Sequence, residues 1–256
     1  MFFDTHCHIH MPDFAGQHQQ IIDRMRQAQV CGAVVVATEV EEIAQVQSLL
    51  DAYPELSGAF ALSPQDERLS DLSAQAIAQY VSGDRWVAVG ETGLDYHYCQ
   101  EPLHWARERF ACHIEAAKIA GKPLIIHSRE AADDTLAILK SHGAQDIGFV
   151  LHCFCGDWDF AKRALDLGGM LSFSGIVTFK NAQDQQEVAA KAPADRIFIE
   201  TDSPYLAPVP MRRHRNEPSF VPYVAQQLAL LRQTSVQEIA QITRENAYRF
   251  FRIASI

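Results

Sequence analysis

Two histidines near the start of the chain, His6 and His8, are spaced so that they can hold one metal ion. Side chains on a strand alternate between its two faces, so both histidines project to one face while Cys7 points away. Such a pair alone could equally be two hydrogen-bonded histidines. The metal interpretation gains weight because five more ligand-type residues follow, each just after a short apolar run. These residues are Glu91, His127, His152, Glu200 and Asp202.

Four imidazoles and two carboxylates are more than one structural zinc ion requires. A site for two ions, bridged by Glu91, is the simpler interpretation, because a carboxylate offers one oxygen to each ion. Asp202 suits two roles, as a ligand and as the general base for an attacking water. Glu200 either shares the face of Asp202 or orients a histidine from behind. The predicted ligands are His6, His8, Glu91, His127, His152 and Asp202.

Eight apolar runs rich in β-branched residues predict eight strands, separated by segments with amphipathic helical spacing. Strictly alternating strands and helices imply parallel pairing, and eight such repeats close into a barrel. The length of 256 residues matches one (β/α)8 barrel. The predicted strands are Phe2-Thr5, Ala33-Thr38, Gly58-Ser63, Trp86-Glu91, Pro123-His127, Gly148-His152, Met170-Ser174 and Arg196-Glu200.

We therefore predict an α/β fold in which residues 1–256 form a single TIM-barrel domain, since no linker or composition shift interrupts the chain. A doubly wound open sheet is the alternative. It is less favoured because the ligand-type residues follow strands one, four, five, six and eight, which converge only if the strand ends form a ring.

The composition limits the possible partners and location. The net charge of −10 argues against a protein that coats nucleic acid, although an enzyme could still hold one strand end. No apolar stretch approaches the ~20 residues that span a bilayer, so we expect no membrane contact.

Six cysteines without a signal peptide suggest reduced thiols and a cytoplasmic location. A zinc knot at Cys153-x-Cys155 would need a second cysteine pair, which the sequence lacks.

Six blocks of the sequence, spread over nearly the whole chain, resemble the signature blocks of TatD-type metal-dependent deoxyribonucleases. The resemblance implies a barrel with one or two divalent cations and nuclease activity, including trimming of DNA from the 3′ end. It also implies that the six ligands named above occupy the family's metal positions. The blocks are Phe3-Asp4-Thr5-His6-Cys7-His8, Gly90-Glu91-Thr92-Gly93-Leu94-Asp95-Tyr96, Ile126-His127-Ser128-Arg129-Glu130-Ala131, His152-Cys153-Phe154, Val177-Thr178-Phe179-Lys180-Asn181 and the segment 200–208.

The sequence departs from that family at three places. Ser63 stands where members often have a histidine that helps with the substrate phosphate. Cys155 replaces a usual serine, and the loop 210–218 keeps its Arg-Asn-Glu-Pro ending but changes the residues before it. We expect metal binding to survive all three changes.

Several residues in the predicted loops above the site suit a nucleic-acid substrate. Arg129, Lys180 and Arg215 could hold phosphate oxygens, and Tyr96 and Tyr205 could stack on a base or pack the rim. Arg215 ends a basic cluster that begins at Arg212 and is either a solvated loop or a phosphate contact.

The leading hypothesis is a hydrolase with two divalent ions, Mg²⁺, Mn²⁺ or Zn²⁺, that trims the ends of DNA or other single-stranded nucleic acid as a monomer. An imidazole-rich site suits Zn²⁺ or Mn²⁺ better than Mg²⁺. The alternative keeps the metal site but acts as an amidase, lactonase or deacylase on a small molecule or aminoacyl ester. A non-catalytic binding module is disfavoured, because a protein that only binds its ligand does not require a general base such as Asp202.

Overall fold

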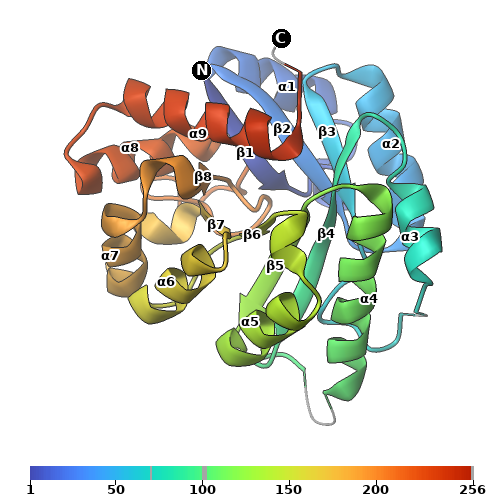
Figure 1. The fold of residues 1–256 in the computed structure, drawn as a ribbon. Helices are drawn as coiled ribbons and strands as arrows, with labels where there is room; N and C mark the ends of the chain where they lie inside the picture. The colour runs from blue at the N-terminus through green and yellow to red at the C-terminus, as the bar shows by residue number, and fades with distance from the viewer. Residues whose placement is uncertain (70, 100–102, 255–256) are drawn as a thin grey trace.

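The computed structural model describes residues 1–69, 71–99 and 103–254. Eight strands form one parallel sheet in the order β1 to β8, and helices surround them (Figure 1). The predicted (β/α)8 TIM barrel is confirmed, and all eight predicted strands are present. The strands are β1 Phe2–Cys7, β2 Val30–Ala37, β3 Leu56–Phe60, β4 Trp86–Asp95, β5 Leu124–Arg129, β6 Phe149–Leu151, β7 Met170–Phe173 and β8 Ile197–Ile199.

The helices follow the strands in alternation and cover the outside of the barrel (Figure 1). No helix in the described ranges has both the length and the apolar composition that a bilayer crossing requires. The α-helices are α1 His18–Gln27, α2 Ile43–Ala52, α3 Ala74–Tyr80, α4 His104–Ala120, α5 Ala132–Ser141, α6 Trp158–Asp166, α7 Gln183–Lys191, α8 Val221–Arg232 and α9 Val236–Phe251. Short 3₁₀ turns lie at Pro12–Phe14, Val40–Glu42, Ala144–Asp146, Gly175–Thr178, Ala194–Arg196 and Pro218–Phe220.

The barrel interior is filled by one apolar cluster to which all eight strands contribute. Two residues of α9, Ala247 and Phe251, belong to the same cluster, so α9 covers one end of the barrel. That end is the amino-terminal one, because Asn246 of α9 donates hydrogen bonds to the carbonyls of Ala194 and Ile197 at the start of β8. The carboxyl end is left for the loops that carry the ligand-type residues.

Strand β4 continues to Asp95, four residues beyond its predicted end. Its pairing with β5 joins Gly93 to His127 and Asp95 to Arg129. Gly93 has φ 133°, and a Cβ at this position would lie 2.0 Å from the His127 carbonyl oxygen. Only glycine permits this close approach of the two backbones. The approach fixes the position of His127 along β5 relative to β4.

The barrel closes where β1 meets the segment that follows β8. The Asp202 amide donates to the His6 carbonyl at 2.9 Å, and the His8 amide donates to the Ser203 carbonyl at 2.8 Å. These backbone hydrogen bonds place the first histidines of the chain beside an aspartate nearly two hundred residues later.

Candidate metal centre

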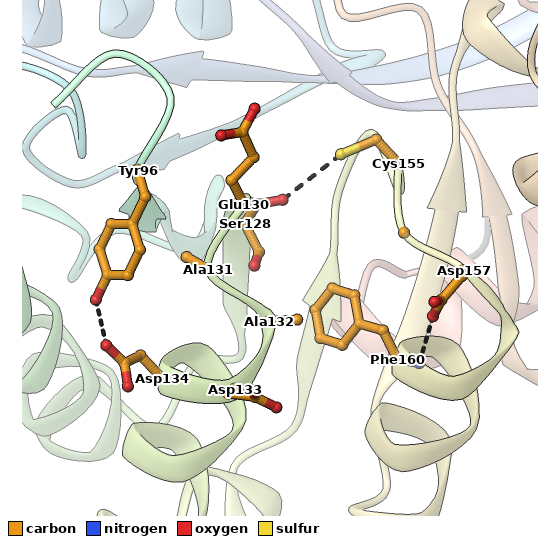
Figure 2. Close-up of a pocket in the computed structure, with 11 residues that line it drawn as sticks. Tyr96, Ser128, Glu130, Ala131, Ala132, Asp133, Asp134, Cys155, Asp157 and Phe160 are labelled. Atoms are coloured by element: carbon orange, nitrogen blue, oxygen red, sulfur yellow. Dashed lines mark hydrogen bonds between the residues drawn. The ribbon is translucent and has the colours of Figure 1, made fainter.

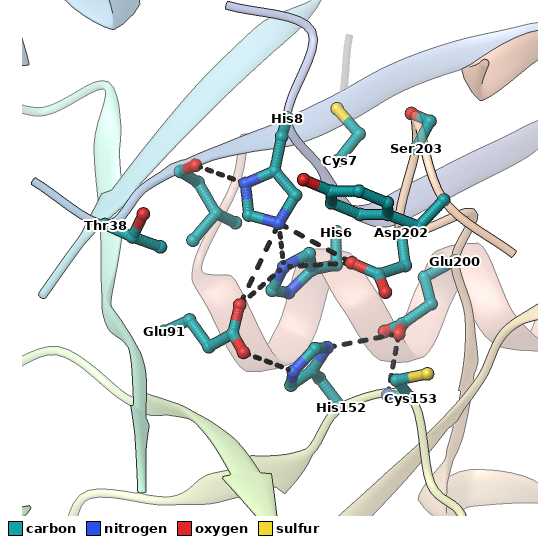
Figure 3. A network of polar contacts seen from close by, with 12 residues as sticks. His6, Cys7, His8, Thr38, Glu91, His152, Cys153, Glu200, Asp202 and Ser203 are labelled. Carbon is teal, nitrogen blue, oxygen red and sulfur yellow. Dashed lines mark hydrogen bonds and ion pairs between the residues drawn. The ribbon is translucent and has the colours of Figure 1, made fainter. Parts of the chain in front are cut away.

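All six predicted ligands meet at the carboxyl end of the barrel, where five different strands end (Figure 3 shows five of them). Their donor atoms form three overlapping groups that could each hold a metal ion, and no cysteine belongs to any group found among the described residues. The groups are His6, His152 and Asp202; His6, His8 and Glu91; and Glu91, His127 and His152.

Glu91 stands at the centre of these groups, with its two oxygens facing different histidines. Its Oε2 lies 3.4 Å from Nε2 of His6 and 3.8 Å from Nε2 of His8. Its Oε1 lies 3.0 Å from Nδ1 of His127 and 3.1 Å from Nε2 of His152. This division of the oxygens is the arrangement that a bridging carboxylate needs.

Asp202 completes the side of the site that holds His6 and His8. Its Oδ1 lies 3.7 Å from Nε2 of His6 and 3.5 Å from Nε2 of His8. Asp202 has φ 56°, a backbone conformation that aspartate tolerates better than most residues and that recurs at functional sites. Asp4 anchors the preceding residue, because its carboxylate accepts from the Thr201 amide at 2.9 Å and from the Thr201 hydroxyl at 2.6 Å.

The donor set fits a divalent cation. Nε2 of His6 and Nε2 of His8 lie 3.1 Å apart, and both face carboxylate oxygens. Nε2 of His152 is buried close to Glu91 yet forms no hydrogen bond with any described residue. Converging imidazole nitrogens and carboxylate oxygens of this kind bind Zn²⁺, Mn²⁺ and related ions.

Acceptors hold the far side of the His8, His127 and His152 imidazoles, whereas Nδ1 of His6 is buried and forms no hydrogen bond with any described residue. Nδ1 of His8 lies 2.8 Å from the Val36 carbonyl oxygen. Nδ1 of His152 lies 3.3 Å from Oε1 of Glu200, which also accepts from the Cys153 amide at 2.6 Å. Of the two predicted roles for Glu200, this geometry favours orientation of His152, since Glu200 belongs to none of the ligand groups.

Asp95 orients His127 and was missed by the sequence analysis. Its Oδ2 lies 2.8 Å from Nε2 of His127, and it also accepts from the Gln65 side chain at 2.7 Å. The spacing of the two acidic residues could have indicated this role, because Glu91 and Asp95 are four residues apart and share one face of a continuous strand. The predicted strand ends at Glu91, so Asp95 lies outside it, whereas β4 continues to Asp95.

The electrostatics of the site favour ionised carboxylates. Burial raises the pKa of Glu91, but the histidines around it, His152 foremost, outweigh burial and hold this pKa well below its usual range. Burial also opposes ionisation of Asp202, but the hydrogen bond with His8 and the charges of His6 and His152 together outweigh burial and lower the Asp202 pKa. Burial lowers the pKa of His6, which favours the neutral imidazole that binds metal.

A cleft of about 720 Å³ opens above these residues. Of the predicted substrate-binding residues, Arg129 and Tyr205 line it. Ser63 and Cys155, two of the departures from the family pattern, line it as well. Tyr98 also lines the cleft, whereas the predicted Tyr96 is not among its lining residues.

Tyr96 lies in a neighbouring pocket of about 580 Å³ rather than in the cleft (Figure 2). Its hydroxyl lies 2.5 Å from Oδ2 of Asp134 and accepts from Nε of Arg107 at 3.0 Å. The two cavities share Ser128 and Cys155 on their common wall. The Tyr96 ring is thus held by helix α5 and faces away from the ligand groups.

Lys180 and Arg215 are not among the described residues that line the cleft. Lys180 is exposed. The Arg215 guanidinium lies over the Phe14 ring, 4.4 Å from its centroid, and donates to the Gln17 side chain at 2.7 Å. Arg215 therefore ties its loop to the segment after β1.

The chain is similar to known proteins in both sequence and structure. Residues 3–252 match the family model described as TatD related DNase. The uncharacterized metal-dependent hydrolase YabD of Bacillus subtilis is 39% identical over 254 residues, covering 99% of this chain and all of that protein. The 3′-5′ ssDNA/RNA exonuclease TatD of Edwardsiella piscicida is 34% identical over 248 residues, covering 94% of this chain and 95% of that protein. The crystal structure of YjjV, a TatD homologue from Escherichia coli, superposes with a TM-score of 0.89 at 30% identity, covering 99% of this chain and 98% of that chain.

Proposed function

This chain belongs to the TatD-related DNase family of metal-dependent hydrolases, and we propose that it is a phosphodiesterase that trims single-stranded DNA from the 3′ end. The similarity to the Edwardsiella exonuclease supports the substrate class. The observation that carries the proposal is the division of the Glu91 oxygens between two sets of histidines. Phosphodiester hydrolysis is a displacement that benefits from positive charge at both the attacking and the leaving oxygen.

Two divalent ions per chain would be held on the two sides of Glu91. His6, His8 and Asp202 with Oε2 of Glu91 would hold one, and His127 and His152 with Oε1 would hold the other. When bound, the ions would lower the pKa of an attacking water and offset the charge that develops on the phosphate.

The protein's own groups would then move the proton and hold the substrate. Asp202 is ionised and lines the cleft, so its carboxylate can accept the proton of the attacking water. The Arg129 guanidinium, at the end of β5, lines the same cleft. It can hold a phosphate oxygen, since its planar group of N–H donors matches the geometry of an oxyanion. The exposed Tyr205 ring can pack against a base at the rim.

The test is incubation of the purified protein with single-stranded DNA labelled at either end, in the presence of Mg²⁺ or Mn²⁺. Trimming from the 3′ end leaves a ladder with a 5′ label and releases a labelled nucleotide at once with a 3′ label. Glu91→Gln should lose this activity. Intact DNA with both ions, for the wild type and Glu91→Gln alike, would refute the proposal.

A second candidate is a metal-dependent amidase, lactonase or deacylase, and two features of the cleft favour it. Ser63 occupies the position of the usual phosphate-binding histidine, and Arg129 is the single Lys or Arg among the described residues that line the cleft. Release of acid from acyl substrates, without release of nucleotides from DNA, would identify this activity.

A further inference from the structure

Two large aromatic side chains stand exposed at the mouth of the cleft. Tyr98 is 62% exposed and Tyr205 is 54% exposed, and both line the cleft. Tyr205 already has a proposed role, whereas Tyr98 has none. An aromatic ring kept in water beside a catalytic cleft loses the stabilisation of burial, and a ligand that covers the ring would recover it.

Tyr98 is held in a defined position despite its exposure. Its backbone amide donates to Oδ1 of Asp95 at 2.9 Å. The His97 ring meets it edge-on at 4.8 Å, and His97 is in turn held by Glu130 at 2.8 Å. The Arg129 guanidinium lies over the ring, 4.8 Å from its centroid. A ring positioned in this way loses little conformational entropy when a ligand stacks on it.

Arg129 is a cation available to an anion. No carboxylate in residues 1–69, 71–99 or 103–254 lies within ion-pair distance of its guanidinium. Its backbone position is fixed by pairing with Asp95 across β4 and β5, two residues beyond His127. The Tyr98 ring and a guanidinium that contacts this ring but no carboxylate of the described residues therefore stand together next to the metal ligands.

We propose that Tyr98 and Arg129 form a subsite for an unpaired nucleotide adjoining the scissile bond, with its base stacked on Tyr98 and its phosphate on Arg129. The inference rests on the proposed nuclease function and gives it a basis for strand selectivity. A base can stack on Tyr98 only after it leaves its own helical stack, which costs less in single strands than in duplexes. A small acyl substrate has no base and phosphate with which to fill both halves of the subsite.

The connection to the metal site runs through one carboxylate. Oδ1 of Asp95 holds the turn that carries Tyr98, while its Oδ2 contacts His127. Asp95 therefore links the position of Tyr98 directly to that of the metal ligand His127.

The experiment compares KM and kcat for two oligonucleotides, one of normal single-stranded DNA and one with abasic residues in its last two 3′ positions. Base stacking contributes roughly 1–3 kcal/mol per base, so Tyr98→Ala should raise KM for normal DNA about 5- to 150-fold, with a smaller effect on kcat. The wild type should show a similar KM penalty on the abasic strand, and Tyr98→Ala should add little to it. Tyr98→Phe should retain the wild-type preference.

Two controls separate the possible failures. Tyr80→Ala removes another exposed tyrosine, at the end of α3 and outside the cleft, and should leave KM unchanged. Melting temperature and metal content of each variant identify any loss of folding. If the wild type leaves all DNA intact, the proposed function fails and the subsite fails with it. If the wild type trims DNA while Tyr98→Ala matches it on both strands, the subsite alone is wrong.

Discussion

The carboxylate of Asp95 lies 2.8 Å from Nε2 of His127, on the opposite side of the imidazole from Glu91. The contact fixes the ring so that Nδ1 faces the site, and a carboxylate partner increases the basicity of a ligating imidazole. Asp95 thus prepares His127 as a ligand without touching an ion itself.

Asp95→Asn should weaken metal binding on the His127 side about 10- to 100-fold, because the neutral amide supports the imidazole less strongly. Isothermal titration of metal-free protein with Mn²⁺ measures this change. Of two binding steps, one should weaken and the other should stay close to wild type. Identical titrations for the variant and the wild type would show that the contact plays no part in metal binding.

Asp202→Asn should lower kcat about 10²- to 10⁴-fold at saturating metal, since the amide cannot accept a proton from water. Glu200→Gln is the matched control, because Glu200 lies two residues earlier and contacts His152 and the Cys153 amide instead of the cleft. Its activity should recover as the metal concentration rises. A kcat for Asp202→Asn near that of the wild type would exclude Asp202 as the general base.

Gly93→Ala should destabilise the protein by several kcal/mol, because the added Cβ would lie 2.0 Å from the His127 carbonyl oxygen and force β4 and β5 apart. Gly121→Ala is the control. Gly121 also has a positive φ, of 65°, but a Cβ there meets no atom within 4 Å, so only backbone strain of about 1–2 kcal/mol applies. Urea unfolding measures both. Equal losses for the two variants would contradict the close approach of the strands.

His113 should make the protein sensitive to mild acid. Burial lowers its pKa to about 3 from 6.5, with the nearby Arg109 adding to the effect. The unfolded chain therefore binds the proton first, so stability from this group is fully present above pH 6.5 and falls as the pH drops toward 3, by about 1.4 kcal/mol per unit.

His113→Gln removes this titration and can keep a hydrogen bond with Thr92, the present partner of Nδ1 at 2.6 Å. Unfolding free energies measured from pH 7 to pH 5 should fall less steeply for the variant than for the wild type. Parallel pH profiles would show that His113 is not kept neutral by burial.

The barrel and its ligand set could be predicted because both depend on local patterns. Runs such as Val34 to Val36 are buried on both sides of a parallel strand, and their spacing alternates with helical periodicity. The carboxyl ends of barrel strands share one rim, so residues that follow the apolar runs had to meet there. This explains why Glu91 and His152 could be placed together from the sequence.

The contacts that depend on loop direction could not be predicted. Tyr96 and Tyr98 follow the same strand two residues apart, and both fit a stacking role by composition. The distinction comes from Asp134 of helix α5, which captures the Tyr96 hydroxyl, and from Asp95, which holds the backbone of Tyr98. Arg215 likewise lies over Phe14 because of contacts across two hundred residues, which no periodicity encodes.

We propose that Glu91 joins two cation sites at one rim of the barrel. Anomalous diffraction from crystals grown with Mn²⁺ would locate the ions. We predict two peaks about 3.5–4 Å apart, one beside each Glu91 oxygen, with His6 and His8 around the first and His127 and His152 around the second. A peak distant from Glu91, or no peak at this rim, would show that Glu91 does not bridge two ions.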